Sequence, residues 1–174
     1  YNMATYNVQG VSIAVLSYKT FDYYDTLHSK VPGQVAAAKE NHDLVVVCYH
    51  WGAEKDYYPN DRQQKLAHAT VDAGADLVVG HHSHRINPIE QYNGVYICYS
   101  LGNFCFSGNS RPKDMSSYIF QTRFRLSEGT ILDRDFRIIP ISISSREDRN
   151  DFIPTVETAP TRIDSMMTVL KTNG

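Results

Sequence analysis

Apolar residues along the chain fall into short runs that are separated by a segment of helical length. Residues 43–49 and 76–79 are apolar and rich in valine, which is typical of buried strands. Between them, residues 61–74 have an apolar stripe, with Asp61 suited to begin a helix and Gly74 suited to end it. A helix between two strands predicts a right-handed crossover, so the two strands are expected to be parallel.

The segments before this crossover continue the same pattern. Residues 11–18 predict a strand, and residues 21–30, where tyrosines alternate with charged residues, predict a loop. Residues 32–41 predict a helix, with Pro32 near its start, where a proline is well tolerated.

The second half of the chain has patterns that are typical of antiparallel strands. Extended segments are predicted at residues 86–92, 95–100, 118–126 and 130–144, and a helix at residues 161–171. Asn93-Gly94 is a strong hairpin signal, and Pro140 is expected to break the last strand. The predicted fold class is α/β (α+β), a mixed sheet with a parallel β-α-β unit followed by antiparallel strands. Residues 1–174 are expected to form a single domain.

Composition is ordinary for a globular protein and disfavours several classes. The chain of 174 residues has a formal net charge of −2, which gives no reason to expect a nucleic-acid partner. No apolar run approaches the roughly 20 residues that a transmembrane helix needs. The cysteines number 3 and include no CxxC pair, which indicates buried thiols and no disulfide framework.

Histidines gather where the two strands of the crossover end. His50 follows the first strand, and His81, His82 and His84 follow the second. Ligands of open parallel sheets bind outside the carboxyl ends of the strands, so these residues are expected to lie together. Residues two apart in an extended segment point the same way, so His82 and His84 are candidates for binding one metal ion. The alternative is a solvated loop that happens to be rich in histidine.

Spaced motifs around these histidines resemble those of a known family. The motifs are His50-Trp51-Gly52-Ala53-Glu54, Pro59, Gln63, Leu66-Ala67, the run from Gly74 to His84, Pro88-Ile89-Glu90, Tyr92, Gly94 and Tyr99-Ser100-Leu101-Gly102-Asn103-Phe104. This set is similar to that of the CapA family. Its members are bacterial capsule-synthesis or poly-γ-glutamate-synthesis proteins, related to calcineurin-like metallophosphoesterases.

The resemblance implies a four-layer sandwich of two sheets flanked by helices, with a site for two divalent metal ions at the strand ends. The metal ligands that it implies are His50, His82 and His84, for Zn, Mn or Fe. Glu54 is a candidate for orienting a ligand or a substrate, and His81 or Glu54 for moving a proton. Asn103 is implied to lie near the site as a further catalytic candidate.

The family's amino-terminal motifs have no match in this chain. Asp22 and Asp25 follow the first strand, but in a different sequence context. The resemblance therefore indicates a fragment, the C-terminal half of a CapA-like domain, which is expected to be inactive alone. The upstream half of the same domain would supply further ligands. Half a sandwich also leaves an apolar sheet face uncovered, which the fragment is expected to bury by self-association.

Two functions follow from the resemblance. The first is capsule or poly-γ-glutamate biosynthesis with a metallophosphoesterase-like, metal-dependent hydrolase site that acts on a phosphoester or on a polymer. The second is a non-catalytic scaffold or export component of polymer assembly with the same fold. The resemblance also implies a bacterial protein that is extracytoplasmic or membrane-associated in its intact form, without a transmembrane segment in this part.

Overall fold

The computed structural model describes residues 2–20, 24–106 and 108–171. In chain order its elements are β1 (Asn2–Val8), β2 (Val11–Lys19), α1 (Tyr24–Asn41), β3 (Leu44–His50), α2 (Asp61–Asp72), β4 (Leu77–His81), β5 (Ile89–Tyr92), β6 (Val95–Cys98), β7 (Ser116–Ser127), β8 (Thr130–Ser142), β9 (Thr155–Val156) and α3 (Pro160–Lys171). The strands form a six-stranded sheet in the order β1-β2-β3-β4-β6-β5 and a three-stranded sheet in the order β7-β8-β9.

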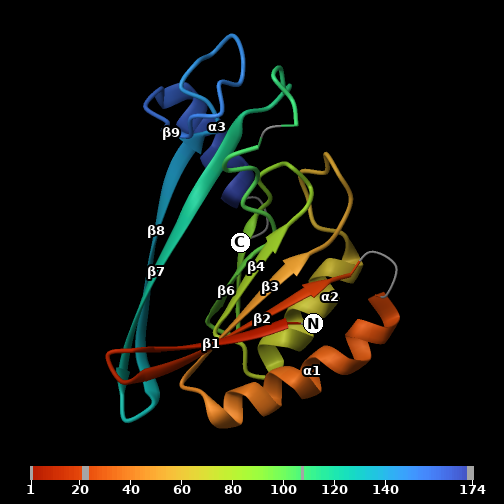
Figure 1. Cartoon of the computed structure of the whole chain (residues 1–174), viewed down its shortest axis with the longest axis vertical. Coiled ribbons are helices and arrows are strands. Elements are labelled where there is room, and N and C mark those ends of the chain that lie inside the picture. Colours follow the sequence, from red (N-terminus) through yellow and green to blue (C-terminus); the bar gives the residue numbers. More distant parts are fainter. Residues whose placement is uncertain (1, 21–23, 107, 172–174) are drawn as a thin grey trace.

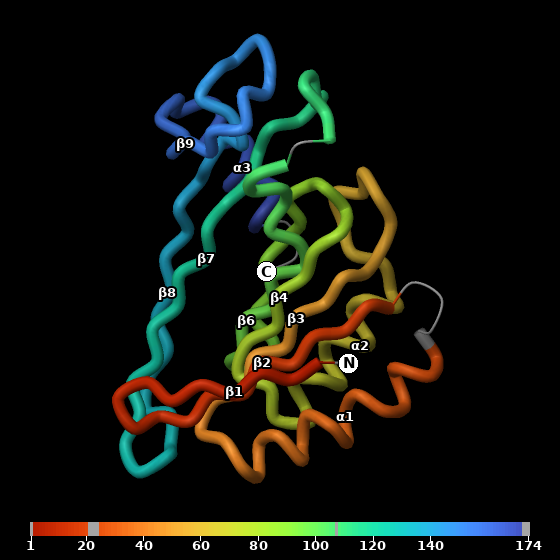
Figure 2. Tube along the Cα trace, in the orientation of Figure 1, coloured from red at the N-terminus to blue at the C-terminus, as the bar shows by residue number. Residues whose placement is uncertain are grey.

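The six-stranded sheet lies between two different layers. Helices α1 and α2 cover one of its faces, and the β7–β8 hairpin stands on the other side as a long ribbon (Figure 1). The chain trace shows α3 beside the end of the ribbon that carries β9 (Figure 2).

The predicted parallel unit is confirmed, and so is the mixed character of the sheet. Strands β2, β3, β4 and β6 are parallel, whereas β1 and β5 pair antiparallel at the two edges. Helix α2 joins β3 to β4, but its cap is Asn60 and not Asp61. The Asn60 side chain accepts a hydrogen bond from Gln63 N (3.0 Å), and the Gln63 side chain accepts one from Asn60 N (3.1 Å). This reciprocal capping box satisfies two main-chain donors at the start of the helix.

Helix α1 starts earlier than the sequence predicts. The loop predicted at residues 21–30 is wrong from Tyr24 onward, and residues 21–23 lie outside the described part of the chain. Pro32 lies inside the helix, where it removes one main-chain hydrogen bond. Val31 and Val35 on either side of it are fully buried in the core. Burial of these side chains outweighs the local penalty of the proline.

Strand β1 was not predicted, and the predicted break in β8 is wrong. The turn Gln9-Gly10 connects β1 to β2 with positive φ at both residues, which is typical of a tight two-residue hairpin. Strand β8 continues through Pro140, whose carbonyl oxygen accepts a hydrogen bond from Glu157 N (2.9 Å). The N–H and C=O of one strand residue face the same side, so the missing donor faces β9 and the pairing with β7 is undisturbed.

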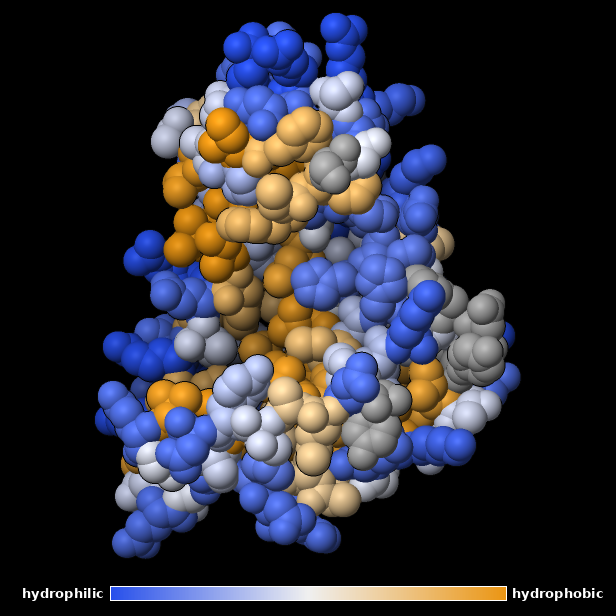
Figure 3. Space-filling model, viewed as in Figure 1, coloured by the Kyte–Doolittle hydropathy of each residue, from blue (hydrophilic) through white to orange (hydrophobic). Residues whose placement is uncertain are grey.

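The face of the six-stranded sheet that points away from the helices is apolar but only partly covered. Its residues include Ile13, Val15, Val46 and Val79, all half-buried. Tyr96 contacts the ribbon through Phe136, with ring centroids 4.6 Å apart. Figure 3 shows apolar residues gathered in the hollow between the ribbon and the sheet.

Two expectations from composition can be compared with the structure. All three cysteines are free thiols. Cys98 is buried as predicted and Cys48 is half-buried, but Cys105 is exposed, so the prediction of buried thiols is wrong for Cys105. Among the residues that the structure describes, no helix is long and apolar enough to cross a bilayer.

Candidate metal centre

Two loops at the carboxyl ends of β3 and β4 carry the candidate site. Their main chains are hydrogen-bonded to each other, from Trp51 N to His81 O (3.1 Å) and from Lys55 N to Ser83 O (2.7 Å). The side chain of Asn87 adds a third link by donating to the carbonyl oxygen of Asp56 (2.9 Å). The two loops therefore form one frame, although α2 separates them in the sequence.

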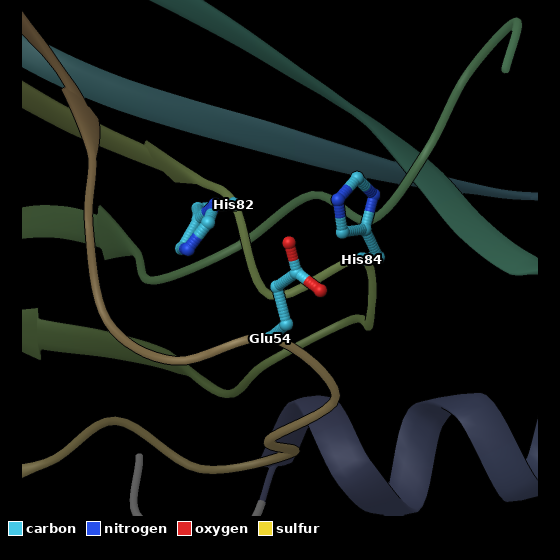
Figure 4. A group of neighbouring side chains, drawn as sticks. All are labelled: Glu54, His82 and His84. Carbon is cyan, nitrogen blue, oxygen red and sulfur yellow. The ribbon is translucent and has the colours of Figure 1, made fainter. Parts of the chain in front are cut away.

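Glu54, His82 and His84 turn their ligand atoms toward one another in this frame. One carboxylate oxygen and one nitrogen from each imidazole all lie within 4.8 Å of one another. Figure 4 shows the carboxylate of Glu54 between the two imidazoles. Glu54 is exposed and the two histidines are half-buried, so solvent can reach the group. Two imidazoles and one carboxylate suit Zn²⁺ or Fe²⁺, so these residues fit a divalent metal ion.

The main chain around the histidines is a tight turn. His82 has a φ of 111° and His84 a φ of 55°, both in the left-handed region that non-glycine residues rarely adopt. The prediction of an extended segment is therefore wrong here, although the two ligand atoms do converge. Ser83 between them is buried, and its hydroxyl donates to the Arg85 carbonyl (2.9 Å). Contacts of this kind hold the unfavourable conformation in place.

Gly80, directly before the histidines, allows a close approach of Tyr99 and Trp51 to β4. It lies within β4. A Cβ at this position would collide with the Tyr99 carbonyl oxygen and the Trp51 indole nitrogen. Those two atoms are themselves hydrogen-bonded (2.9 Å). Only glycine fits beside this pair, so Gly80 fixes where the histidine loop leaves the sheet.

Asn103 orients one of the candidate ligands. His84 Nδ1 lies 2.7 Å from Asn103 Oδ1, and because an amide oxygen only accepts hydrogen bonds, Nδ1 carries the proton. The lone pair of His84 is then on Nε2, as metal ligation through that atom requires. Asn103 thus contacts a candidate ligand, in keeping with its expected place near the site.

His50 and His81 lie beside the group of three. They are neighbours across the ends of β3 and β4, and the His50 ring centroid is 4.7 Å from that of His82. In the described part of the chain, the group that brings three ligand atoms together contains Glu54 where the resemblance implies His50.

The local environment favours neutral imidazoles. Burial lowers the pKa of His50, His81 and His82 below the usual value. The charge of Lys19 lowers the pKa of His50 further, and Glu54 partly offsets the effect at His82. These histidines are therefore neutral at pH 7, and only a neutral imidazole has a free lone pair for a metal ion.

A third loop braces the site from residues that the sequence patterns did not single out. Tyr57 donates a hydrogen bond to Asp114 Oδ2 (2.7 Å), and Arg85 Nε lies 3.9 Å from the same oxygen. The Arg85 guanidinium is also 5.7 Å from the centroid of the Tyr57 ring. The three residues belong to separate loops, so no local spacing connects them. The resemblance covered residues near two of them but did not extend to Asp114.

Comparison with known proteins places the chain in a family. Residues 1–108 match the model of the family described as bacterial capsule synthesis protein PGA_cap. The chain belongs to this family. The CapA resemblance is thereby confirmed, and the match includes every strand end and loop that carries Glu54, His82 and His84.

Named relatives of this PGA_cap chain are considerably longer than it is. The PGA biosynthesis protein CapA of Bacillus subtilis (strain 168) is 57% identical over 81 residues, which cover 46% of this chain and 21% of the relative. The capsule biosynthesis protein CapA of Bacillus anthracis is 39% identical over 159 residues, 82% of this chain and 37% of the relative. A probable polyglutamine synthesis accessory protein of Mycobacterium tuberculosis is 41% identical over 73 residues, which cover 42% of this chain and 19% of the relative. The chain therefore matches well under half the length of each.

A solved structure supports the fold. A hypothetical protein from Thermus thermophilus superposes with a TM-score of 0.50, over 79% of this chain and 61% of that chain. The sequence identity is 16%, so the likeness concerns the α/β fold alone.

Proposed function

We propose that this PGA_cap chain carries a metal-dependent hydrolase site that serves capsule or poly-γ-glutamate biosynthesis. The observation that supports it most is the convergence of Glu54, His82 and His84 at the carboxyl ends of parallel strands. Three protein ligands with an open position are typical of catalytic metal sites, whereas structural sites are usually closed. The names of the two Bacillus relatives favour a role in making a capsule polymer.

The residues have distinct roles in this proposal. Glu54, His82 and His84 would hold a divalent metal ion such as Zn, Mn or Fe, and Asn103 would keep His84 in the ligating tautomer. The metal ion would polarise a phosphoryl or carbonyl oxygen and make water a stronger acid. His50 is close enough to His82 to be a further ligand, and His81 would accept or return a proton.

The substrate would be a phosphoester or an amide bond of a polyglutamate-like polymer. The upstream half of the same domain would supply additional ligands and cover the apolar face around Val15 and Val46. This assignment is consistent with the greater length of the relatives. Activity is therefore expected of the longer protein and not of this part alone.

The decisive experiment compares metal content by mass spectrometry after dialysis against mixed divalent metals. Near-stoichiometric metal is expected in the unchanged chain, with loss in His82→Ala/His84→Ala. The double variant His28→Ala/His42→Ala removes two histidines that lie away from the site, and it should retain the metal. Equal metal content in all three proteins would refute the assigned ligands. Hydrolysis of a generic phosphodiester by the longer protein that survives His82→Ala would refute the catalytic role.

A non-catalytic scaffold or export component is the second candidate function. It is favoured by the number of ligand atoms, because the group of three in the described residues is smaller than a two-metal hydrolase requires. The Mycobacterium relative is also named an accessory protein. Polymer production that persists in cells with His50→Ala/His82→Ala would support the scaffold, whereas its loss would support the hydrolase.

A further inference from the structure

Strand β1 is an edge strand without the usual protection against pairing. The opposite edge of the same sheet, β5, is short and packs against α3 through Ile89. The edge strand β7 carries the exposed charges of Arg123 and Arg125. Strand β1 contains neither a charged residue nor a proline, and all seven of its residues are exposed. Natural edges are normally blunted by charge, proline or a covering element. Within the part of the chain that the structure describes, β1 has none of these.

The turn after β1 determines which main-chain groups face the free edge. The Gln9-Gly10 turn makes Val8 and Val11 the closing pair of the hairpin. In a two-residue hairpin the closing pair is hydrogen-bonded, and such pairs alternate along the ladder. Met3, Thr5 and Asn7 therefore turn their N–H and C=O groups away from β2. These three alternate residues offer main-chain hydrogen-bond donors and acceptors to another strand.

We propose that β1 pairs antiparallel with β1 of a second copy of the chain, about a two-fold axis at Thr5. Antiparallel pairing centred on Thr5 places Met3 opposite Asn7, and Met3, Thr5 and Asn7 are the residues with outward main-chain groups. The same pairing places the large side chain of Tyr6 opposite the small one of Ala4. A two-fold axis brings the same surface patch of the two copies together, so that patch must not repel itself. Strand β1 is uncharged and meets this condition.

The side chains beside this edge also gain from a second strand. Met3 and Tyr6 are 49% and 57% exposed, a large apolar area for a single strand. On the helix side, a groove of about 590 Å³ runs between β1 and α1. It is lined by Met3, Lys30, Gly33, Gln34, Ala37, Ala38, Asn41 and His42. A second β1 would lie along the open side of this groove and shield Met3 from water.

The size of the contact sets the expected strength. A strand of seven residues is roughly 23 Å long, at about 3.3 Å per residue. The pairing would bury less than the roughly 1,000 Å² of a stable interface. The dimer is therefore expected to be weak and to depend on concentration.

The test measures mass by sedimentation equilibrium across a wide range of concentration, first for the unchanged chain. Its average mass should rise from that of a monomer toward that of a dimer. Thr5→Lys and Thr5→Glu should each weaken the dimer by up to about fivefold, because two like charges would meet at the axis. An equimolar mixture of the two variants should regain the dimer, since opposite charges would then face each other. Gln121→Lys adds a charge to the exposed edge strand β7 and should leave the mass unchanged.

Three results would overturn the proposal. One is a monomer at every concentration. Another is a dimer that Thr5→Lys does not weaken, particularly if Val15→Lys does weaken it, which would place the second copy on the open sheet face. The last is a loss of dimer in both Thr5 variants without recovery in the mixture. Circular dichroism of each variant separates these outcomes from misfolding.

Discussion

Asn103 controls the geometry of one candidate ligand through a single hydrogen bond. Replacing it by alanine leaves His84 Nδ1 without its acceptor, so the imidazole is free to rotate and to change tautomer. Asn103→Ala should lower the affinity for a divalent metal ion by about 10-fold to 100-fold. Titration calorimetry would measure this loss. Asn103→Asp, which keeps an acceptor, should retain most of the affinity, and Asn41→Ala on α1 should change nothing. Equal affinities for Asn103→Ala and the unchanged chain would contradict this role.

The sequence locates the chemistry of single residues better than their geometry. Their position next to a strand end made His82 and His84 candidate ligands, whereas the family resemblance gave Glu54 another role and named His50 as the third ligand. The left-handed backbone of the two histidines was not predictable, because it depends on main-chain contacts between loops that α2 separates. Tyr57 and Asp114 were missed for a similar reason, since their contact exists only after three loops have assembled.

Among the secondary-structure elements, β4 depends on the absence of a side chain at Gly80. A methyl group there would push against the Tyr99 carbonyl and the Trp51 indole, both held in the core. Gly80→Ala should reduce the free energy of unfolding by about 1–3 kcal/mol. Urea denaturation is the measurement. Gly33→Ala is the matched control, because a Cβ at that position on α1 meets no atom within 4 Å. It should stabilise the protein by up to about 1 kcal/mol. A Gly80→Ala protein as stable as the Gly33→Ala protein would disprove the packing role.

Element types were predictable where the local pattern and the burial agree. The valine-rich runs of β3 and β4 and the capped, amphipathic α2 are such cases. Predictions based on Pro32 and Pro140 went wrong because tertiary contacts overrode local preference. Val31 and Val35 bury enough apolar area to extend α1 through a proline. Strand β8 continues through Pro140 because its pairing with β7 does not need the N–H that Pro140 lacks.

At the scale of the whole molecule, Asp76 joins the ribbon to the helix-covered sheet. Its carboxylate is 5% exposed and binds Lys39 Nζ (2.8 Å), Arg134 Nη2 (3.3 Å) and the main-chain nitrogen of Val45 (2.8 Å). Arg134 comes from β8 and also donates to Gly94 O (2.8 Å). The end of the ribbon near the β7–β8 turn is therefore fixed to the starts of β3 and β4.

Removing this charge should loosen the ribbon from the rest of the fold. Asp76→Asn leaves two cations without their shared partner and should cost about 3 kcal/mol of unfolding free energy. Asp135→Asn breaks an exposed pair with Arg123 and should cost about 1 kcal/mol or less. Urea denaturation would compare them, and hydrogen exchange should increase along β8 in the Asp76 variant alone. Similar losses in both variants would show that Asp76 is no special anchor. The sequence predicted β7 and β8 as strands, but no local pattern indicates this link across 58 residues.

The loops around Glu54, His82 and His84 are joined by main-chain atoms at Trp51–His81 and Lys55–Ser83. Nearly every amino acid supplies the same main-chain donor and acceptor, so this frame does not depend on which side chains point into it. Substitution at position 54, 82 or 84 can therefore change the chemistry offered to an ion while the loops stay where they are. In evolution or in protein engineering, one set of ligands could therefore be exchanged for another within this frame without redesigning the fold.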